Sequence, residues 1–308
     1  MADEELGMIF AKIKRILDVD ELMQHKIGAE TVVDVYAEDA PNFQIFYSVK
    51  GSIHLALSED GRFQRDGYYG HARIIRKSIE EIQARDVLEL GSGRGFNLIH
   101  LAKQKPEVRF EGIDLIPANV QTSRKCSRML NHLGFQVGNI EELGYASETF
   151  DIVFTVESLS HVANIPKALS EAYRVLKPGG RMVVFDLYCQ EDLEAVTPAQ
   201  KKAIQVAENS LVMLSPMTAK HLAKIAQAAG FRLVSMENLS RHVLPDVKRR
   251  NWLVELAFDL PWITRIIMQS FSLNTVRGMV AWELIPTLFK ANLLGYYQVV
   301  FEKTGEKG

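Results

Sequence analysis

Three glycines, Gly91, Gly93 and Gly95, stand where an apolar stretch ends at Leu90. An apolar run that stops at closely spaced glycines and resumes with helical spacing predicts a strand, a tight loop and a helix. Because glycine has no Cβ atom and adopts positive φ, such a loop lets the backbone approach a ligand closely. The helix that follows offers free N–H groups at the same place. The segment therefore predicts a nucleotide-type ligand site, with a turn that binds no ligand as the alternative.

The spacing of these glycines distinguishes two kinds of nucleotide site. A dinucleotide fingerprint requires a glycine at position 96, where this chain has Phe96. An acidic residue, Glu89, stands two positions before the first glycine. The pattern Glu-x-Gly-x-Gly-x-Gly resembles the first motif of the class I S-adenosylmethionine-dependent methyltransferases. This resemblance implies that the loop surrounds the amino-acid end of S-adenosylmethionine, a zwitterion without phosphates.

A second acidic residue, Asp114, stands near the end of the next predicted strand. A carboxylate there suits the two hydroxyls of a ribose, although it could instead cap the following helix. After the third strand, many relatives in the class carry aspartate to accept a hydrogen bond from adenine. This chain has Asn139, whose amide oxygen can still accept, with Ile140 beside the adenine face. The predicted cofactor-binding residues are Glu89, Gly91, Gly93, Gly95, Asn97, Asp114, Leu115, Asn139, Ile140 and Glu157.

Glu157 and His161 follow the predicted fourth strand and are the candidate catalytic residues. If a helix begins there, their spacing places both side chains on one face. Together with residues 172–180, they resemble the sterol C-methyltransferase and tocopherol methyltransferase branch of the class. With an oxygen or nitrogen acceptor, such groups would take a proton; with an alkene, the carboxylate would stabilise positive charge. Alternatively, Glu157 only orders the cofactor's amino group and His161 is structural.

The segment between the predicted sixth strand, at 231–236, and the predicted seventh strand, at 294–301, contains all three tryptophans. Small-molecule pockets are concave and mostly apolar, so this segment predicts a lid over a lipophilic acceptor, with a plain packed helical subdomain as the alternative. The run Lys248–Arg250 is either a solvated face or a contact for a phosphate or an anionic headgroup. The predicted acceptor-binding residues are Tyr36, His54, Trp252, Trp262 and Trp282.

Strands and helices alternate from Asp86 to Tyr188, and the strands are apolar on both faces. This pattern is typical of a parallel sheet covered by helices on both sides. We predict an α/β fold with a Rossmann-like, mostly parallel sheet of seven strands. The predicted domains are an N-terminal helical cap and cofactor-closing segment at 1–78, a core at 79–240 with 291–308, and a helical lid at 241–290, inserted before the last strand.

Composition excludes several classes of function. The 308 residues carry a formal net charge of −2, with basic residues spread along the chain, which argues against nucleic acid as the main partner. Two cysteines fit a reducing compartment, and the histidines lack metal-ligand spacing, so no metal is predicted. Without a signal peptide or a bilayer-length apolar run, the chain is predicted to be cytoplasmic, with peripheral membrane contact and oligomeric state left open.

These observations predict an S-adenosylmethionine-dependent methyltransferase that releases S-adenosylhomocysteine. Its predicted acceptor is a small lipophilic molecule such as a sterol, terpenoid, prenyl-quinone or fatty-chain compound, with carbon as one candidate for the methylated atom. The alternative within the class is N- or O-methylation of a small polar amine or phenol. More distant alternatives are an NAD-dependent oxidoreductase and a non-catalytic binding protein with the same fold.

Overall fold

The computed structural model describes residues 2–24, 27–38, 51–190, 196–260, 262 and 272–305. The aromatic stretch at 43–47 and residues 263–271 of the predicted lid therefore lie outside the described residues. Within the described part of the chain, every helix is too short or too polar to cross a lipid bilayer.

Seven strands form one sheet in the order β3-β2-β1-β4-β5-β7-β6. β7 pairs antiparallel with β5 and β6, and the other pairs are parallel. This arrangement confirms the predicted Rossmann-like, mostly parallel sheet. The strands are β1 (Asp86–Leu90), β2 (Arg109–Asp114), β3 (Leu133–Val137), β4 (Phe150–Val156), β5 (Leu176–Cys189), β6 (Phe231–Asn238) and β7 (Leu294–Lys303).

Helices cover both faces of the sheet, because the strands are apolar on both sides. One buried cluster joins α5, α6 and α7 to one face, and a second joins α8 and α10 to the other. The described helices are α1 (Ala2–Ile13), α2 (Val19–Gln24), α3 (Ala29–Glu38), α5 (Gly70–Ile82), α6 (Phe96–Gln104), α7 (Pro117–Ser127), α8 (Ile165–Val175), α9 (Pro198–Ser210), α10 (Ala219–Ala228), α11 (Ser240–Asp259) and α13 (Leu273–Lys290), with 3₁₀ turns η1 (Arg65–Tyr69) and η2 (Leu159–His161).

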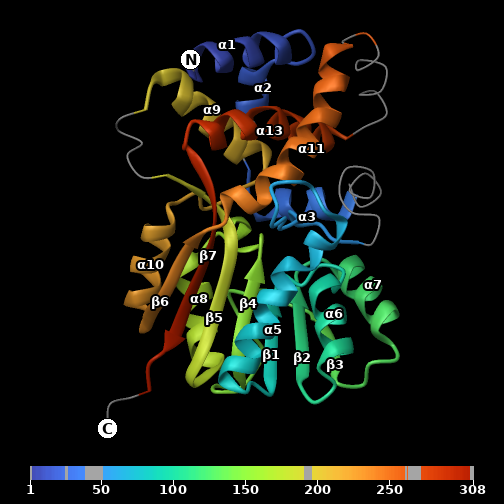
Figure 1. Ribbon diagram of the computed structural model, residues 1–308, viewed down its shortest axis with the longest axis vertical. Coiled ribbons are helices and arrows are strands. Elements are labelled where there is room, and N and C mark those ends of the chain that lie inside the picture. The colour runs from blue at the N-terminus through green and yellow to red at the C-terminus, as the bar shows by residue number, and fades with distance from the viewer. Residues whose placement is uncertain are drawn as a thin grey trace.

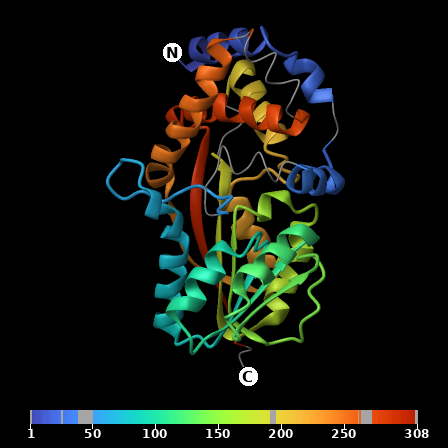
Figure 2. The ribbon, with the colours of Figure 1, turned by 90° about the vertical axis from the view of Figure 1, so that its right-hand side faces the viewer.

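Four helices, α1, α9, α11 and α13, pack together and form a helical layer beyond the carboxyl edge of the sheet (Figures 1 and 2). Two ion pairs join α1 to α13 within this layer: Glu5 with Lys290, and Lys12 with Glu283. The N-terminal helices and the segment before β7 are thus in direct contact. The domain boundaries given above remain a prediction.

Candidate functional site

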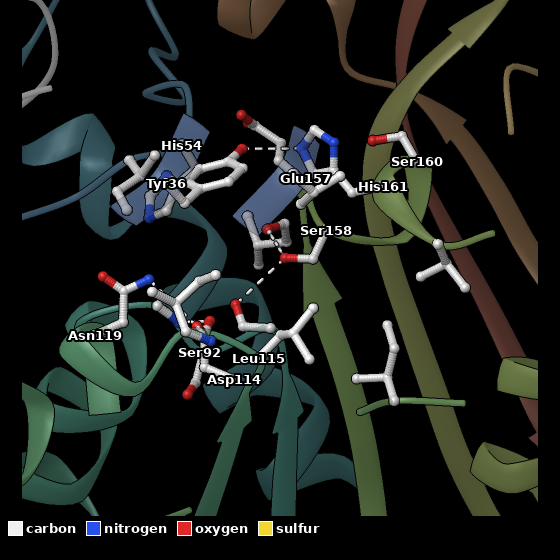
Figure 3. A pocket seen from close by; sticks show the side chains of 18 of the residues that line it. Tyr36, His54, Ser92, Asp114, Leu115, Asn119, Glu157, Ser158, Ser160 and His161 are labelled. Atoms are coloured by element: carbon white, nitrogen blue, oxygen red, sulfur yellow. Dashed lines mark hydrogen bonds between the residues drawn. The ribbon is translucent and has the colours of Figure 1, made fainter. Parts of the chain in front are cut away.

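A cavity of about 240 Å³ lies where the strands end, between the sheet and the helical layer (Figure 3). Its floor comes from the β1–α6 loop and from the residues that follow β2, β3 and β4. Its roof includes Tyr36 of α3 and Trp282 of α13. Parallel sheets bind ligands at this edge, so the cavity is the candidate functional site.

The glycine loop has the backbone conformation that its composition predicted. Gly91, Gly93 and Gly95 have φ of 69°, 53° and 78°, a region that side chains disfavour. A Cβ atom on Gly91 would collide with Ser158 Oγ, and one on Gly95 would lie 2.6 Å from the ring of Phe135. Both backbone conformation and packing therefore require glycine here.

Replacing Gly91 by alanine is expected to lower the free energy of unfolding by about 1–3 kcal/mol, from backbone strain at positive φ and the collision with Ser158. Denaturant unfolding would measure this loss. The double variant Gly91→Ala/Ser158→Gly should recover the part that comes from the collision. Gly144→Ala is the matched control, because no atom beyond its chain neighbours lies within 4 Å of its added Cβ; equal losses at 91 and 144 would contradict the prediction.

Asp114, at the end of β2, holds the glycine loop and the start of α7 together. Its carboxylate accepts hydrogen bonds from Gly93 N at 2.8 Å, Ile116 N at 2.9 Å and Asn119 Nδ2 at 3.2 Å. Burial raises the pKa of Asp114, and these hydrogen bonds oppose the rise. The side chain lines the cavity, where the predicted ribose contact would lie. Asp114 is not the N-cap of α7, because Ile116 occupies that position and no side chain caps the helix there.

Glu89 and Asn97 form a buried pair at the cavity wall. Asn97 Nδ2 donates to Glu89 Oε1 at 2.9 Å, while Glu89 Oε2 has no hydrogen-bond partner among the described residues. Burial raises the pKa of Glu89 to about 8. An unsatisfied buried carboxylate oxygen suits a cationic donor. The ammonium and sulfonium groups of S-adenosylmethionine fit a cavity lined by Glu89, Asp114 and Glu157.

The remaining predicted cofactor residues lie at the cavity rim. Leu115 and Asn139 are exposed, Ile140 is half-buried, and all three line the cavity. The Asn139 Oδ1 atom already accepts from Glu141 N at 2.9 Å. An amide oxygen has two lone pairs, so one remains for a ligand. Among the described residues, no group of three or more metal-ligating side chains is placed to hold a metal ion.

Glu157 stands directly after β4 with a φ of 51°, outside the helical region. No helix begins at Glu157, because the short 3₁₀ turn begins only at Leu159. Helical spacing therefore does not place the Glu157 and His161 side chains on one face. Glu157 Oε1 accepts from Leu55 N and from the Tyr296 hydroxyl, each at 2.9 Å. Burial raises the pKa of Glu157 to about 7, so the carboxyl group can exchange a proton near neutral pH.

His161 and Tyr36 are hydrogen-bonded across the cavity, with 2.9 Å between the hydroxyl and Nε2 (Figure 3). His161 Nδ1 lies 2.9 Å from the carbonyl oxygen of Val212, which can only accept. A neutral ring therefore carries its proton on Nδ1, and Nε2 accepts from Tyr36. Val212 has a φ of 56°, a strained value for a β-branched residue, and this conformation directs its carbonyl to the ring.

Two further predicted acceptor residues line the cavity. The His54 ring is buried, and its Nδ1 lies 3.0 Å from the Leu55 carbonyl oxygen. Burial lowers the pKa of His54 to about 4, so the ring is neutral at pH 7. Trp282 is buried, and the Arg250 guanidinium lies 4.9 Å from the centre of its ring.

The structure does not bring Trp252 and Trp262 to the cavity. Their exposed fractions are 57% and 66%, and neither lines it. Trp252 lies on the solvent side of α11, since Val254 and Phe258 are the buried residues of that stretch. Nor is the basic run uniformly solvated: Arg249 and Arg250 both form ion pairs with the buried Asp246.

Three residues of this region were missed from sequence. Asp186 of β5 is buried at the cavity and accepts from Ser160 N and Leu187 N, each at 2.9 Å. A single aspartate inside an apolar strand was the available signal. Tyr296 and His71, which support Glu157 from behind, carry no local signal, because their importance depends on distant contacts.

Comparisons with known proteins agree with this geometry. A family model described as a methyltransferase domain matches residues 88–184. The chain is 27% identical over 171 residues to a phthiotriol/phenolphthiotriol dimycocerosates methyltransferase of Mycobacterium leprae, a match that covers 54% of this chain and 57% of that protein. It is 24% identical over 313 residues to 24-methylenesterol C-methyltransferase 2 of Arabidopsis thaliana, covering 92% and 85%.

The chain thus spans little more than half the length of the first of these relatives. Among solved structures, the [4+2]-cyclase SpnF matches with a TM-score of 0.68 and 19% identity, covering 90% of this chain and 97% of that one. At this identity, the likeness supports the fold alone.

Proposed function

Because the chain belongs to the class I S-adenosylmethionine-dependent methyltransferases, we propose that it transfers the methyl group of S-adenosylmethionine to a small lipophilic acceptor. The observation that carries this proposal is the apolar roof of the cavity. Val32, Leu211, Met213 and Trp282 face a floor that holds the glycine loop and the carboxylates. An apolar roof with few polar groups is typical of sites for lipophilic molecules.

The names of two relatives support the same acceptor class. One is named for phthiotriol dimycocerosates and one for a methylenesterol. The cofactor would supply an electrophilic methyl group on a sulfonium. Glu89 and the glycine loop would hold its amino-acid end, and Asp114 its ribose. Tight alignment and exclusion of water are then the main contributions of the protein.

We assign the acid–base role to Glu157. With an alkene acceptor, its carboxylate stabilises the positive charge that methylation leaves on the acceptor and takes the proton that is then lost. Its pKa of about 7 allows it to hold that proton and release it afterwards. Asp186, buried beside the same space, adds negative potential.

One observation favours a second candidate, methylation of an oxygen or nitrogen atom. The Tyr36 hydroxyl is bonded to a histidine nitrogen that can accept its proton. Such a pair could remove a proton from a hydroxyl or amine acceptor. Transfer to carbon and transfer to a heteroatom therefore use different residues, Glu157 in the first case and Tyr36 with His161 in the second.

An acceptor panel with methyl-labelled S-adenosylmethionine tests the proposal. We expect transfer to a sterol or prenyl-quinone acceptor, and none to ethanolamine-type acceptors. Transfer to the polar amines alone would replace the proposal with the second candidate. Binding of S-adenosylhomocysteine without turnover on any acceptor would contradict both, and would favour a binding protein with this fold.

A further inference from the structure

A chain of hydrogen bonds connects Glu157 to the core of the protein. The Tyr296 hydroxyl donates to Glu157 Oε1 at 2.9 Å, and it lies 2.8 Å from His71 Nε2. Tyr296 and His71 both have an exposed fraction of 0%, and neither lines the cavity. The end of β4, the first residues of β7 and the start of helix α5 thus meet behind one carboxylate.

The direction of these bonds follows from the donors available. Tyr296 has one hydroxyl proton, which it gives to Glu157, so its oxygen accepts the proton on His71 Nε2. Burial lowers the pKa of His71 well below its usual range, so the ring is neutral and carries one proton. His54 and Phe185 pack edge-on against this ring at 4.7 and 4.9 Å between ring centres and hold its orientation.

Charged groups on other elements act on Glu157 in opposite directions. Burial raises its pKa, and Asp186 of β5 raises it further. The Leu55 N–H group, the Arg250 guanidinium of α11 and the Tyr296 hydroxyl lower it. Arg250 is already bound to Asp246, which leaves Tyr296 as the neutral side chain that donates directly to the carboxylate.

We propose that Tyr296, itself oriented by His71, is a positioning residue that holds Glu157 in its ionised form facing the cavity. The inference rests on the proposed function, since it assigns the ionised form to the acid–base step. A donor to an ionised carboxylate forms a charge-assisted bond, which weakens when the carboxyl group takes a proton. Tyr296 therefore favours the form of Glu157 that is ready to accept a proton.

The test compares Tyr296→Phe with Tyr297→Phe. Tyr297 is the matched control because it is the next residue of β7, donates to Gln190 and does not line the cavity. Loss of the donor to Glu157 should raise the apparent pKa of the kcat profile by about one pH unit or more. At pH 6, kcat should then fall about tenfold, while raising the pH should recover it and the KM for cofactor should stay constant.

A direct titration of Glu157 separates this proposal from the proposed function. Carboxyl carbons of labelled glutamate would be followed by NMR against pH, with Glu157→Gln used to assign the signal. An upward shift in Tyr296→Phe, absent in Tyr297→Phe, would support the positioning role even if no acceptor were methylated. An unchanged titration would overturn it. If Tyr296→Phe fails to fold, His71→Gln should show a smaller shift in the same direction, and no shift there would also overturn it.

Discussion

Replacing Glu157 by glutamine is expected to lower kcat by about 10²- to 10⁴-fold, the range for loss of a positioned proton acceptor. Glutamine has nearly the same shape, and its amide oxygen can still accept from Leu55 N and the Tyr296 hydroxyl. It carries no negative charge and cannot take a proton at neutral pH. The fold and the cavity should therefore persist while the chemical step is lost, as steady-state kinetics with a methylated acceptor would show.

The affinity for S-adenosylhomocysteine separates the two roles considered for Glu157. If the carboxylate acts on the acceptor, calorimetry should give nearly equal affinities for the wild type and Glu157→Gln. Glu208→Gln is a matched control, because Glu208 is also a glutamate whose pKa burial raises, but it lies outside the cavity. Full activity in Glu157→Gln would remove the proposed role; a large loss of affinity with unchanged kcat would assign Glu157 to the cofactor instead.

Replacing Asp114 by alanine is expected to weaken binding of S-adenosylhomocysteine by about 1–3 kcal/mol. The substitution removes the carboxylate that we assign to the ribose hydroxyls. It also leaves the N–H groups of Gly93 and Ile116 without their acceptor, so the glycine loop loses a support. Calorimetry would measure the change, and thermal unfolding without ligand would report the loss of loop support by itself.

A cycle that combines protein and ligand changes isolates the ribose contact. With an analogue of S-adenosylhomocysteine that lacks the ribose hydroxyls, Asp114→Ala should cost much less affinity than with the intact ligand. The difference between the two losses is the coupling between Asp114 and the hydroxyls. Equal losses for both ligands would mean that Asp114 acts only by holding the loop and the start of α7.

Tertiary structure decided which of the aromatic candidates meet. Tyr36 and His161 could each be proposed from sequence, but their hydrogen bond joins residues 125 positions apart. For Trp252, Trp262 and Trp282 there was one and the same reason to predict an acceptor contact from the sequence, namely an aromatic side chain in the segment before β7. Only Trp282 lines the cavity, because packing within the helical layer determines which side of each helix faces inward.

The hydrogen bonds behind Glu157 could not be predicted from the sequence either. Tyr296 and His71 are 225 positions apart, and each is an unremarkable residue of its own strand or helix. Their burial and their contact arise only when α5 packs on the face of the sheet to which β7 contributes Tyr296. A buried hydrogen-bond chain of this kind has no period and no fixed spacing for a sequence pattern to reveal.

By itself, the sequence determined the side of the cavity that we assign to the cofactor: the glycine loop, Asp114 and the alternation of strands and helices. These features depend on local backbone conformation and on the rule that parallel strands end at one edge, so neighbouring residues suffice to predict them. Only the tertiary structure decided the side that we assign to the acceptor, where residues of α3, α13 and the 3₁₀ turn after β4 line the cavity. That arrangement is set by side-chain packing between distant segments, a property of the folded chain as a whole.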